Sequence, residues 1–165
     1  MAIRAMREDE GMTKVDEGAS VPRIGAAERE RLSHALDRDH VVAGMLFGSL
    51  ARGNKVGPLS DVDIAVWLDP DLPREELASL RADLSSAAVA TLGTNEIDLV
   101  VLNEAPPLLR HRAMSGATRL LDRDPKARVR LETTALLDYF DTAPLRAMLA
   151  AGRRRRIEEG RFGRR

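Results

Sequence analysis

Two apolar runs, separated by a loop with no helical pattern, constrain the fold of this chain more than any other feature. The first run, Val41–Phe47, is continuous, and the second, Asp61–Leu68, is rich in β-branched residues. Runs of this kind are typical of buried strands. Residues 49–60 between them contain two glycines and a proline, which favour a loop over a crossover helix. Because parallel neighbours need a crossover, we expect the two strands to be antiparallel neighbours in a mixed sheet.

Helical and strand patterns continue along the rest of the chain. Leucines one turn apart predict a helix over residues 26–39, and leucines at helical spacing predict another from Pro73 to Gly93. Further on we expect a strand over residues 95–102, a short helix over 106–114 and another strand over 117–124. Two C-terminal helices should follow, one over residues 125–141 and one from Pro144 onward. This succession predicts an α/β fold with a small mixed sheet and a helical C-terminal extension.

The two C-terminal helices both carry large apolar side chains. The first has an apolar stripe, and on the second three residues are expected to face inward; these are Val129, Leu136, Leu137 and Phe140, then Leu145, Met148 and Leu149. The run Arg153–Arg156 that follows has glutamates and only Phe162 as an aromatic nearby, so we favour contact with a partner protein, or a mobile end, over RNA binding.

The length of 165 residues indicates one domain with some length left over. Residues 1–22 are polar and lack apolar periodicity, so we expect a disordered leader or a segment ahead of an alternative start. Residues 23–124 then form the core, and residues 125–165 form the C-terminal helices and the basic tail.

Composition excludes several classes of site. The chain has no cysteine, which removes disulfides, thiolate metal sites and cysteine nucleophiles, and its three histidines are too few for a histidine-rich zinc site. The formal net charge is zero and aromatic residues are scarce, so neither supports direct nucleic-acid binding. The longest apolar stretch, Val41–Ala51, is too short to span a bilayer, and we expect a cytoplasmic protein without a membrane partner.

A Gly-Ser pair follows the first predicted strand directly. Gly48 and Ser49 would present backbone N–H groups with no bulky side chain in the way, which suits a phosphate. Arg52 lies one turn further on, near enough to contact phosphates, although a packing role is also open. Such turns are common, and the pair taken alone is equally compatible with a plain turn.

Three aspartates lie on the two later predicted strands. Asp61 and Asp63 are two residues apart, so both point to one face of their strand. Oxygen ligands of this kind select Mg²⁺ or Mn²⁺. Asp98 lies in an otherwise apolar strand and points away from Leu99; if the two strands are neighbours, three carboxylates meet at one end of the sheet. Taken singly, each is also compatible with a surface carboxylate. Together with the Gly-Ser turn, they are the parts of a two-metal phosphoryl or nucleotidyl transfer site.

The segments LFGSLARG, SDVDIAVWL and EIDLVVL resemble the polymerase-β-like nucleotidyltransferase superfamily, specifically its minimal nucleotidyltransferases. Residues 100–146 resemble the MntA family of antitoxins in that group, so the resemblance covers Val41–Arg146. It implies a small mixed-sheet nucleotidyltransferase fold. It also implies that Gly48 and Ser49 hold the triphosphate of ATP.

The same resemblance assigns the metal ligands and the reaction. Asp61, Asp63 and Asp98 would bind two Mg²⁺ ions, with Mn²⁺ as a possible substitute, and Asp98 would help to lower the pKa of the attacking hydroxyl. Family members transfer AMP from ATP to a tyrosine of a HEPN-domain (HepT-like) ribonuclease toxin, which is usually encoded next to the antitoxin. The segment Leu50–Ser60 is one residue longer than is usual in the family. Insertions in such a Gly/Pro loop cost little, and the spacing of the carboxylates is intact.

Two other functions stay open at this point. A non-catalytic antitoxin would neutralise its toxin by occupying its surface, although the presence of all three aspartates and the Gly-Ser pair argues against it. A nucleotidyltransferase acting on a small molecule, of the aminoglycoside-modifying type, usually has a larger C-terminal substrate domain than the residues after Pro125 provide. Among the remaining residues, we expect Trp67 to belong to the core and His111 to be a partly exposed helix residue. Arg110 and Arg112 either reach a phosphate or an acidic partner, or are solvated.

Overall fold

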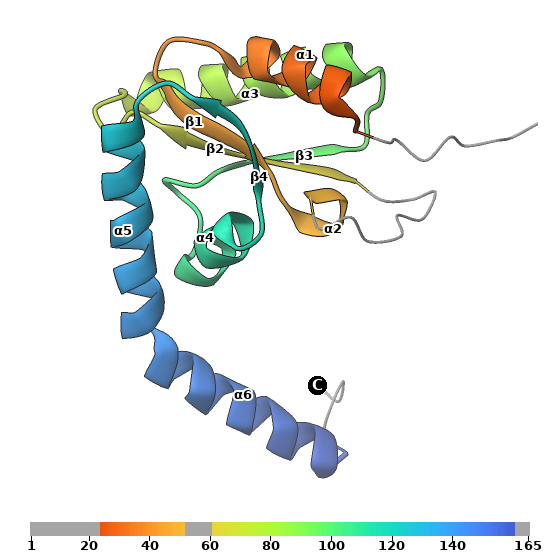
Figure 1. The fold of residues 1–165 in the computed structure, drawn as a ribbon. Coiled ribbons are helices and arrows are strands. Elements are labelled where there is room, and N and C mark those ends of the chain that lie inside the picture. The colour runs from red at the N-terminus through yellow and green to blue at the C-terminus, as the bar shows by residue number, and fades with distance from the viewer. Residues whose placement is uncertain (1–23, 52–60, 161–165) are drawn as a thin grey trace, which may run out of the picture.

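The computed structural model describes residues 24–51 and 61–160, which form one four-stranded sheet with helices on both faces (Figure 1). The strands are β1 (Val41–Leu46), β2 (Val62–Leu68), β3 (Ile97–Val101) and β4 (Thr118–Asp122). Their order is β3-β2-β1-β4. β1 is antiparallel to both β2 and β4, and β2 is parallel to β3. The prediction that the first two strands are antiparallel neighbours in a mixed sheet is therefore confirmed.

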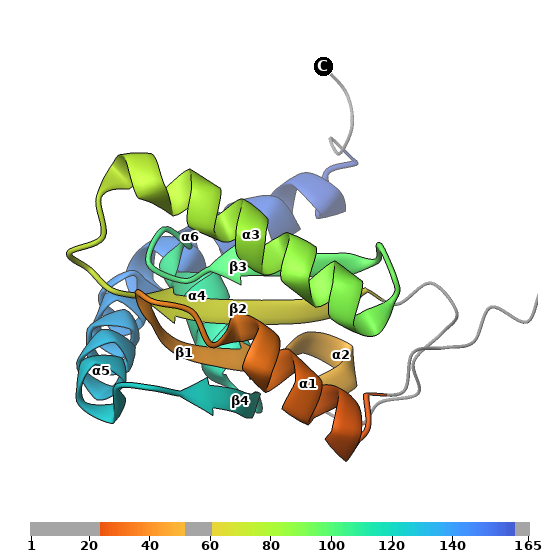
Figure 2. The same ribbon diagram turned by 90° about the horizontal axis from the view of Figure 1, so that it is seen from above.

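Helices cover the two faces of this sheet in pairs. They are α1 (Ala26–Leu36), α2 (Gly48–Ala51), α3 (Arg74–Leu92), α4 (Pro107–Met114), α5 (Pro125–Asp141) and α6 (Ala143–Glu158). α1 and α3 lie on one face, and α4 and the start of α5 lie on the other (Figures 1 and 2). No helix in the described ranges is long and apolar enough to cross a membrane.

Alternation along the strands divides the core into two layers. Val62, Ile64 and Val66 of β2 face α1 and α3, where they pack with leucines such as Leu84. Ala65 and Trp67 point to the other face and pack with residues of α4 and α5. Trp67 is only 1% exposed, so its predicted place in the core is confirmed.

The chain after β1 departs from the prediction over a few residues. Gly48–Ala51 forms one short helical turn, α2, where the sequence indicated a loop. Gly48 has a φ of 75°, which turns the backbone sharply out of the strand before that helical turn begins. A turn this short has no apolar periodicity, so the sequence pattern gave no sign of it.

The two C-terminal helices also differ from expectation in the faces that they bury. We call α5 and α6 together the C-terminal arm. Leu145, Met148 and Leu149 were expected to face inward, but they are 54%, 70% and 59% exposed. No residue of α6 is buried, because the helix extends away from the sheet and packs mainly on the end of α5 (Figure 1).

The apolar stripe predicted on α5 is likewise not the face that packs on the sheet. Val129, Leu136, Leu137 and Phe140 are all more than 40% exposed. α5 contacts the second core layer through the opposite side of the helix, which carries two alanines and one leucine, namely Ala127, Ala135 and Leu131. Small residues let a helix approach a neighbouring element closely, and α5 uses them for this purpose.

Candidate active site

The turn after β1 brings Gly48 against a carboxylate of β2. The antiparallel pairing of Leu46 with Ile64 places the end of β1 beside the start of β2. The backbone N–H of Phe47 donates to the carbonyl oxygen of Asp63 at 3.0 Å. A Cβ atom added to Gly48 would lie 1.9 Å from Oδ2 of Asp63, so this position has no room for a side chain. Together with its positive φ, this close approach makes glycine a physical requirement.

Asp63 and Asp98 are neighbours across the parallel pair of β2 and β3. Their Cα atoms are partners in the register, and the backbone N–H of Val62 donates to the carbonyl oxygen of Glu96 at 2.8 Å just before them. Register partners point to the same face of a sheet, here the face of the second core layer. The condition that the two strands lie side by side is met.

Burial differs among the three aspartates. Asp63 is half-buried and Asp98 is exposed. Asp61, the residue immediately before β2, is also exposed. In the part of the chain that the structure describes, no group of three or more acidic or histidine side chains is close enough to hold a metal ion. The strand register thus brings Asp63 and Asp98 to adjacent positions. Their like charges repel, so without a cation the two carboxylates are not drawn closer together.

Ser49 and Arg52 are the other two residues predicted to hold phosphate. Ser49 is half-buried in α2, directly after the Gly48 turn. Arg52 lies outside the described residues, as does the loop that is one residue longer than usual.

Comparison with known proteins places these residues in a family. Residues 30–126 match the family described as polymerase beta, nucleotidyltransferase, which is more than half of the chain and includes every predicted site residue. The chain belongs to the polymerase beta nucleotidyltransferase family. A comparison with curated proteins gave no match.

Solved structures share the fold of this nucleotidyltransferase. A mutant of the toxin-antitoxin pair MntA-HpeT has 19% identity and a TM-score of 0.60, covering 74% of this chain and 96% of the other. A tri-AMPylated HEPN toxin of Shewanella oneidensis in complex with its MNT antitoxin has 19% identity and a TM-score of 0.56, with 76% and 95% covered. A toxin-antitoxin with AMP-PNP has 22% identity and a TM-score of 0.51, with 79% and 96% covered. At these identities the likeness shows the fold alone.

Two basic residues singled out from the sequence of this nucleotidyltransferase have structural contacts. Arg110 of α4 donates to Asp138 at 3.1 Å and to the carbonyl oxygen of Asn103 at 2.8 Å. The ring of His111 stacks on that of Tyr139, with centroids 3.8 Å apart. Both residues therefore tie α4 to neighbouring segments, and Arg112 is exposed.

Sequence reasoning missed Asn103, which closes the far end of the parallel strand pair. Its side-chain amide accepts from the backbone N–H of Leu68 and donates to the carbonyl oxygen of the same residue, both at 2.9 Å. An asparagine immediately after a strand was the available signal, since its amide can pair with backbone beyond the last ladder bond.

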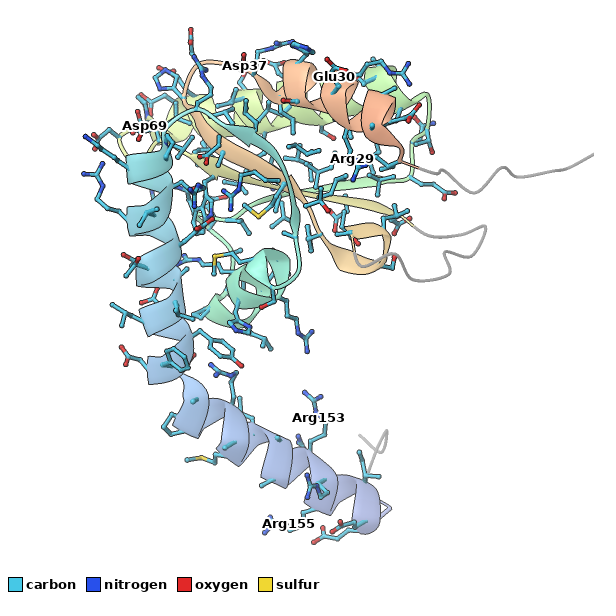
Figure 3. All side chains as sticks on the ribbon, viewed as in Figure 1. Arg29, Glu30, Asp37, Asp69, Arg153 and Arg155 are labelled. Carbon is cyan, nitrogen blue, oxygen red and sulfur yellow. The ribbon has the colours of Figure 1, made fainter. Side chains whose placement is uncertain are left out.

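A cavity of about 650 Å³ lies at the opposite end of the sheet from the Gly48 turn. Trp67, Asp69 and Arg130 are among its lining residues, and Asp69 lies far from α2 in Figure 3. None of the described candidate residues of the nucleotidyltransferase site lines this cavity. The candidate site and this cavity thus lie at different ends of the described structure.

Proposed function

We propose that this chain is a metal-dependent nucleotidyltransferase that transfers AMP from ATP to a tyrosine of a cognate HEPN ribonuclease toxin, and so acts as the antitoxin of that pair. One observation carries the proposal: Gly48 packs against the Asp63 carboxylate, which is in register with Asp98, inside the segment that matches the family. The solved structures of the same fold support the choice of acceptor and nucleotide, because one contains a tri-AMPylated HEPN toxin and another AMP-PNP.

The residues at this end of the sheet fit divalent cations of the magnesium type. Asp61, Asp63 and Asp98 offer only carboxylate oxygens, the donor type that Mg²⁺ and Mn²⁺ prefer. Because Gly48 has no side chain, its turn packs directly against the Asp63 carboxylate. We assign these three aspartates as ligands of two Mg²⁺ ions. When bound, such ions neutralise phosphate charge and lower the pKa of the attacking hydroxyl.

The remaining residues of the site bind and orient the nucleotide. In this proposal the backbone N–H groups of Gly48 and Ser49 would hold the triphosphate. Arg52 is assigned to the same phosphates from the sequence alone. In the reaction, the tyrosine oxygen forms a bond to the α-phosphorus while the bond from that phosphorus to the bridging oxygen breaks. The products are a tyrosyl-AMP ester, pyrophosphate and the proton released from the tyrosine hydroxyl.

The shape of the C-terminal extension favours a protein acceptor over a small molecule. A small acceptor needs a pocket that encloses it. The described residues after Pro125 form two successive helices, and α6 runs away from the sheet (Figure 1). No cavity among those found in the described residues is lined by both this extension and Asp61, Asp63 or Asp98.

Mass spectrometry of a reconstituted reaction tests the proposal. We expect the purified chain, with ATP and Mg²⁺, to add one or more AMP groups to a HEPN-domain protein encoded beside it. Asp63→Asn should lower the rate by about 100-fold or more, because the variant loses a carboxylate at the metal site. Asp83→Asn is the matched control: it makes the same change on the exposed surface of α3 and should leave the rate unaltered.

Two results would contradict the proposal. Unmodified toxin that is nevertheless neutralised equally well by the wild type and by the Asp61→Asn, Asp63→Asn double variant would establish a non-catalytic antitoxin. Transfer of AMP to a small hydroxylated molecule but not to the HEPN protein would instead establish a small-molecule nucleotidyltransferase.

A further inference from the structure

Most of the exposed large apolar side chains in the described residues lie on the two helices of the C-terminal arm. Of the nine such residues in the described ranges, eight belong to the C-terminal arm and the ninth, Leu108, to the neighbouring α4. Their exposed fractions reach 59% at Leu137 and Phe140 and 70% at Met148. Exposed apolar residues scattered singly need no explanation, but eight of them concentrated on two successive helices favour an interaction site.

A groove between α4 and α5 lies beside these exposed apolar side chains. It has a volume of about 350 Å³, and Met114 of α4 lines it together with Val129 and Leu136 of α5. Such a groove accepts an apolar side chain from a partner, and the flanking helix adds further contact area.

Side-chain contacts hold the junction, or elbow, between α5 and α6, although α6 packs mainly on α5. At this elbow, the guanidinium of Arg146 donates to the carbonyl oxygen of Tyr139 at 2.6 Å and lies 3.9 Å from the centre of its ring. Tyr139 in turn stacks on His111 of α4. Because the elbow is already ordered, a partner that docks on the arm loses less conformational entropy than one that must order it.

The charge of the arm indicates what kind of partner covers it. α6 contains five arginines and one glutamate, and four of the arginines are the run Arg153–Arg156. Arg153 and Arg155 extend from opposite sides of the helix (Figure 3). A second copy docked arm to arm would bring the same excess of positive charge, whereas an acidic surface would neutralise it.

We infer that the C-terminal arm is the docking surface for the protein acceptor, and that the acceptor presents apolar side chains bordered by acidic ones. This inference rests on the proposed function for the identity of the acceptor, the HEPN-domain toxin. The arm then holds the acceptor by its apolar face and its arginines, while the aspartates of β2 and β3 act on the acceptor tyrosine.

Two arm variants and one control variant test the inference. L137S/F140S removes exposed apolar area, and R153E/R156E reverses charge at exposed positions, so neither substitutes a residue of the buried core. R74E/R81E makes the same charge reversal on exposed residues of α3 and is the control. Emission of the single tryptophan, Trp67, and far-ultraviolet circular dichroism check that each variant is folded.

Calorimetric titration with the purified HEPN protein measures docking. We expect each arm variant to weaken binding about tenfold or more, and the control to stay within about twofold of wild type. Added salt should weaken the wild-type complex more than the R153E/R156E complex. Equal affinity of all variants would overturn the inference. So would a wild-type dimer that dissociates in L137S/F140S without loss of toxin affinity, since a second copy would then cover the arm.

Transfer of AMP in the same samples separates this inference from the proposed function. If both hold, KM for the toxin rises about tenfold in the arm variants while kcat is retained. A wild-type chain that binds the toxin through the arm but transfers no AMP would refute the proposed function alone. Transfer with the same KM in every variant would refute the docking surface alone.

Discussion

In the core layer formed by the sheet with α1 and α3, leucines such as Leu32 and Leu84 are completely buried, whereas in the C-terminal arm four leucines are more than 40% exposed. Leu84 of α3 is 0% exposed and Leu137 of α5 is 59% exposed, although both are leucines in the middle of long helices. An apolar pattern therefore reports helical periodicity, but the element packed against it decides burial. In the first region apolar residues stabilise the scaffold that places the aspartates; in the second they are available to a partner.

Truncation of one leucine in each region gives the largest expected contrast. Leu84→Ala should destabilise the protein by about 2–5 kcal/mol, because it leaves a cavity in the buried layer. Leu137→Ala should change stability by no more than about 0.5 kcal/mol, because little buried area is lost. Urea unfolding followed through Trp67 emission measures both. Similar losses for the two variants would mean that the arm is part of the cooperative core.

The second contrast concerns glycines with a positive φ inside and outside the site. Gly48→Ala should cost about 2–3 kcal/mol, since the new Cβ would collide with the Asp63 carboxylate 1.9 Å away and the backbone is strained as well. Gly93→Ala is the control for strain alone. It has a φ of 66° with nothing within 4 Å of the added atom, so it should cost only about 1 kcal/mol. Equal costs at the two positions would mean that the Gly48 turn yields to a side chain.

Much of the scaffold was predictable because it depends on local patterns. The two central strands follow from Val41–Phe47 and Asp61–Leu68, and alternation correctly separated Leu99 from Asp98. That β2 and β3 are adjacent was left as a condition, because strand pairing across an intervening helix is non-local and no local pattern records it.

The buried face of α5 was not predictable from hydrophobicity alone. Four of its large apolar residues face outward, and the packed side uses one leucine, Leu131, with Ala127 and Ala135, which a search for large apolar side chains passes over. For the candidate site, residue types and phase could be predicted from sequence. The contact between Gly48 and Asp63 could not, because it depends on the pairing of the two strands.

Helix propensity within the arm gives a smaller effect of opposite sign. Gly152 lies inside α6 with nothing within 4 Å of an added Cβ. Gly152→Ala should stabilise the helix by about 0.5–1 kcal/mol, and Ala151→Gly should have the reverse effect. Because α6 packs mainly on α5, we expect amide hydrogen exchange within α6 to slow roughly threefold in Gly152→Ala while the urea midpoint of the core is unchanged. A parallel shift of that midpoint would show that α6 unfolds together with the core.

The smallest expected effect is a pH dependence of stability that comes from Glu28 in α1, one of the two helices on the first face of the sheet. The pKa of Glu28 in α1 is lowered from its ordinary value of 4.5, chiefly by the backbone N–H of Glu28 itself and then, against an opposing effect of desolvation, by Gly25 and Arg31. Gly25 N–H donates to its carboxylate at 3.0 Å, and Arg31 pairs with it at 3.0 Å. A lowered folded-state pKa stabilises the protein above pH 4.5, and this contribution is lost as the pH falls below that value. Glu28→Gln should thus be slightly less stable than wild type near neutral pH, with the difference disappearing in acid. Urea midpoints measured across this pH range test the sign, and a difference that grows in acid would refute it.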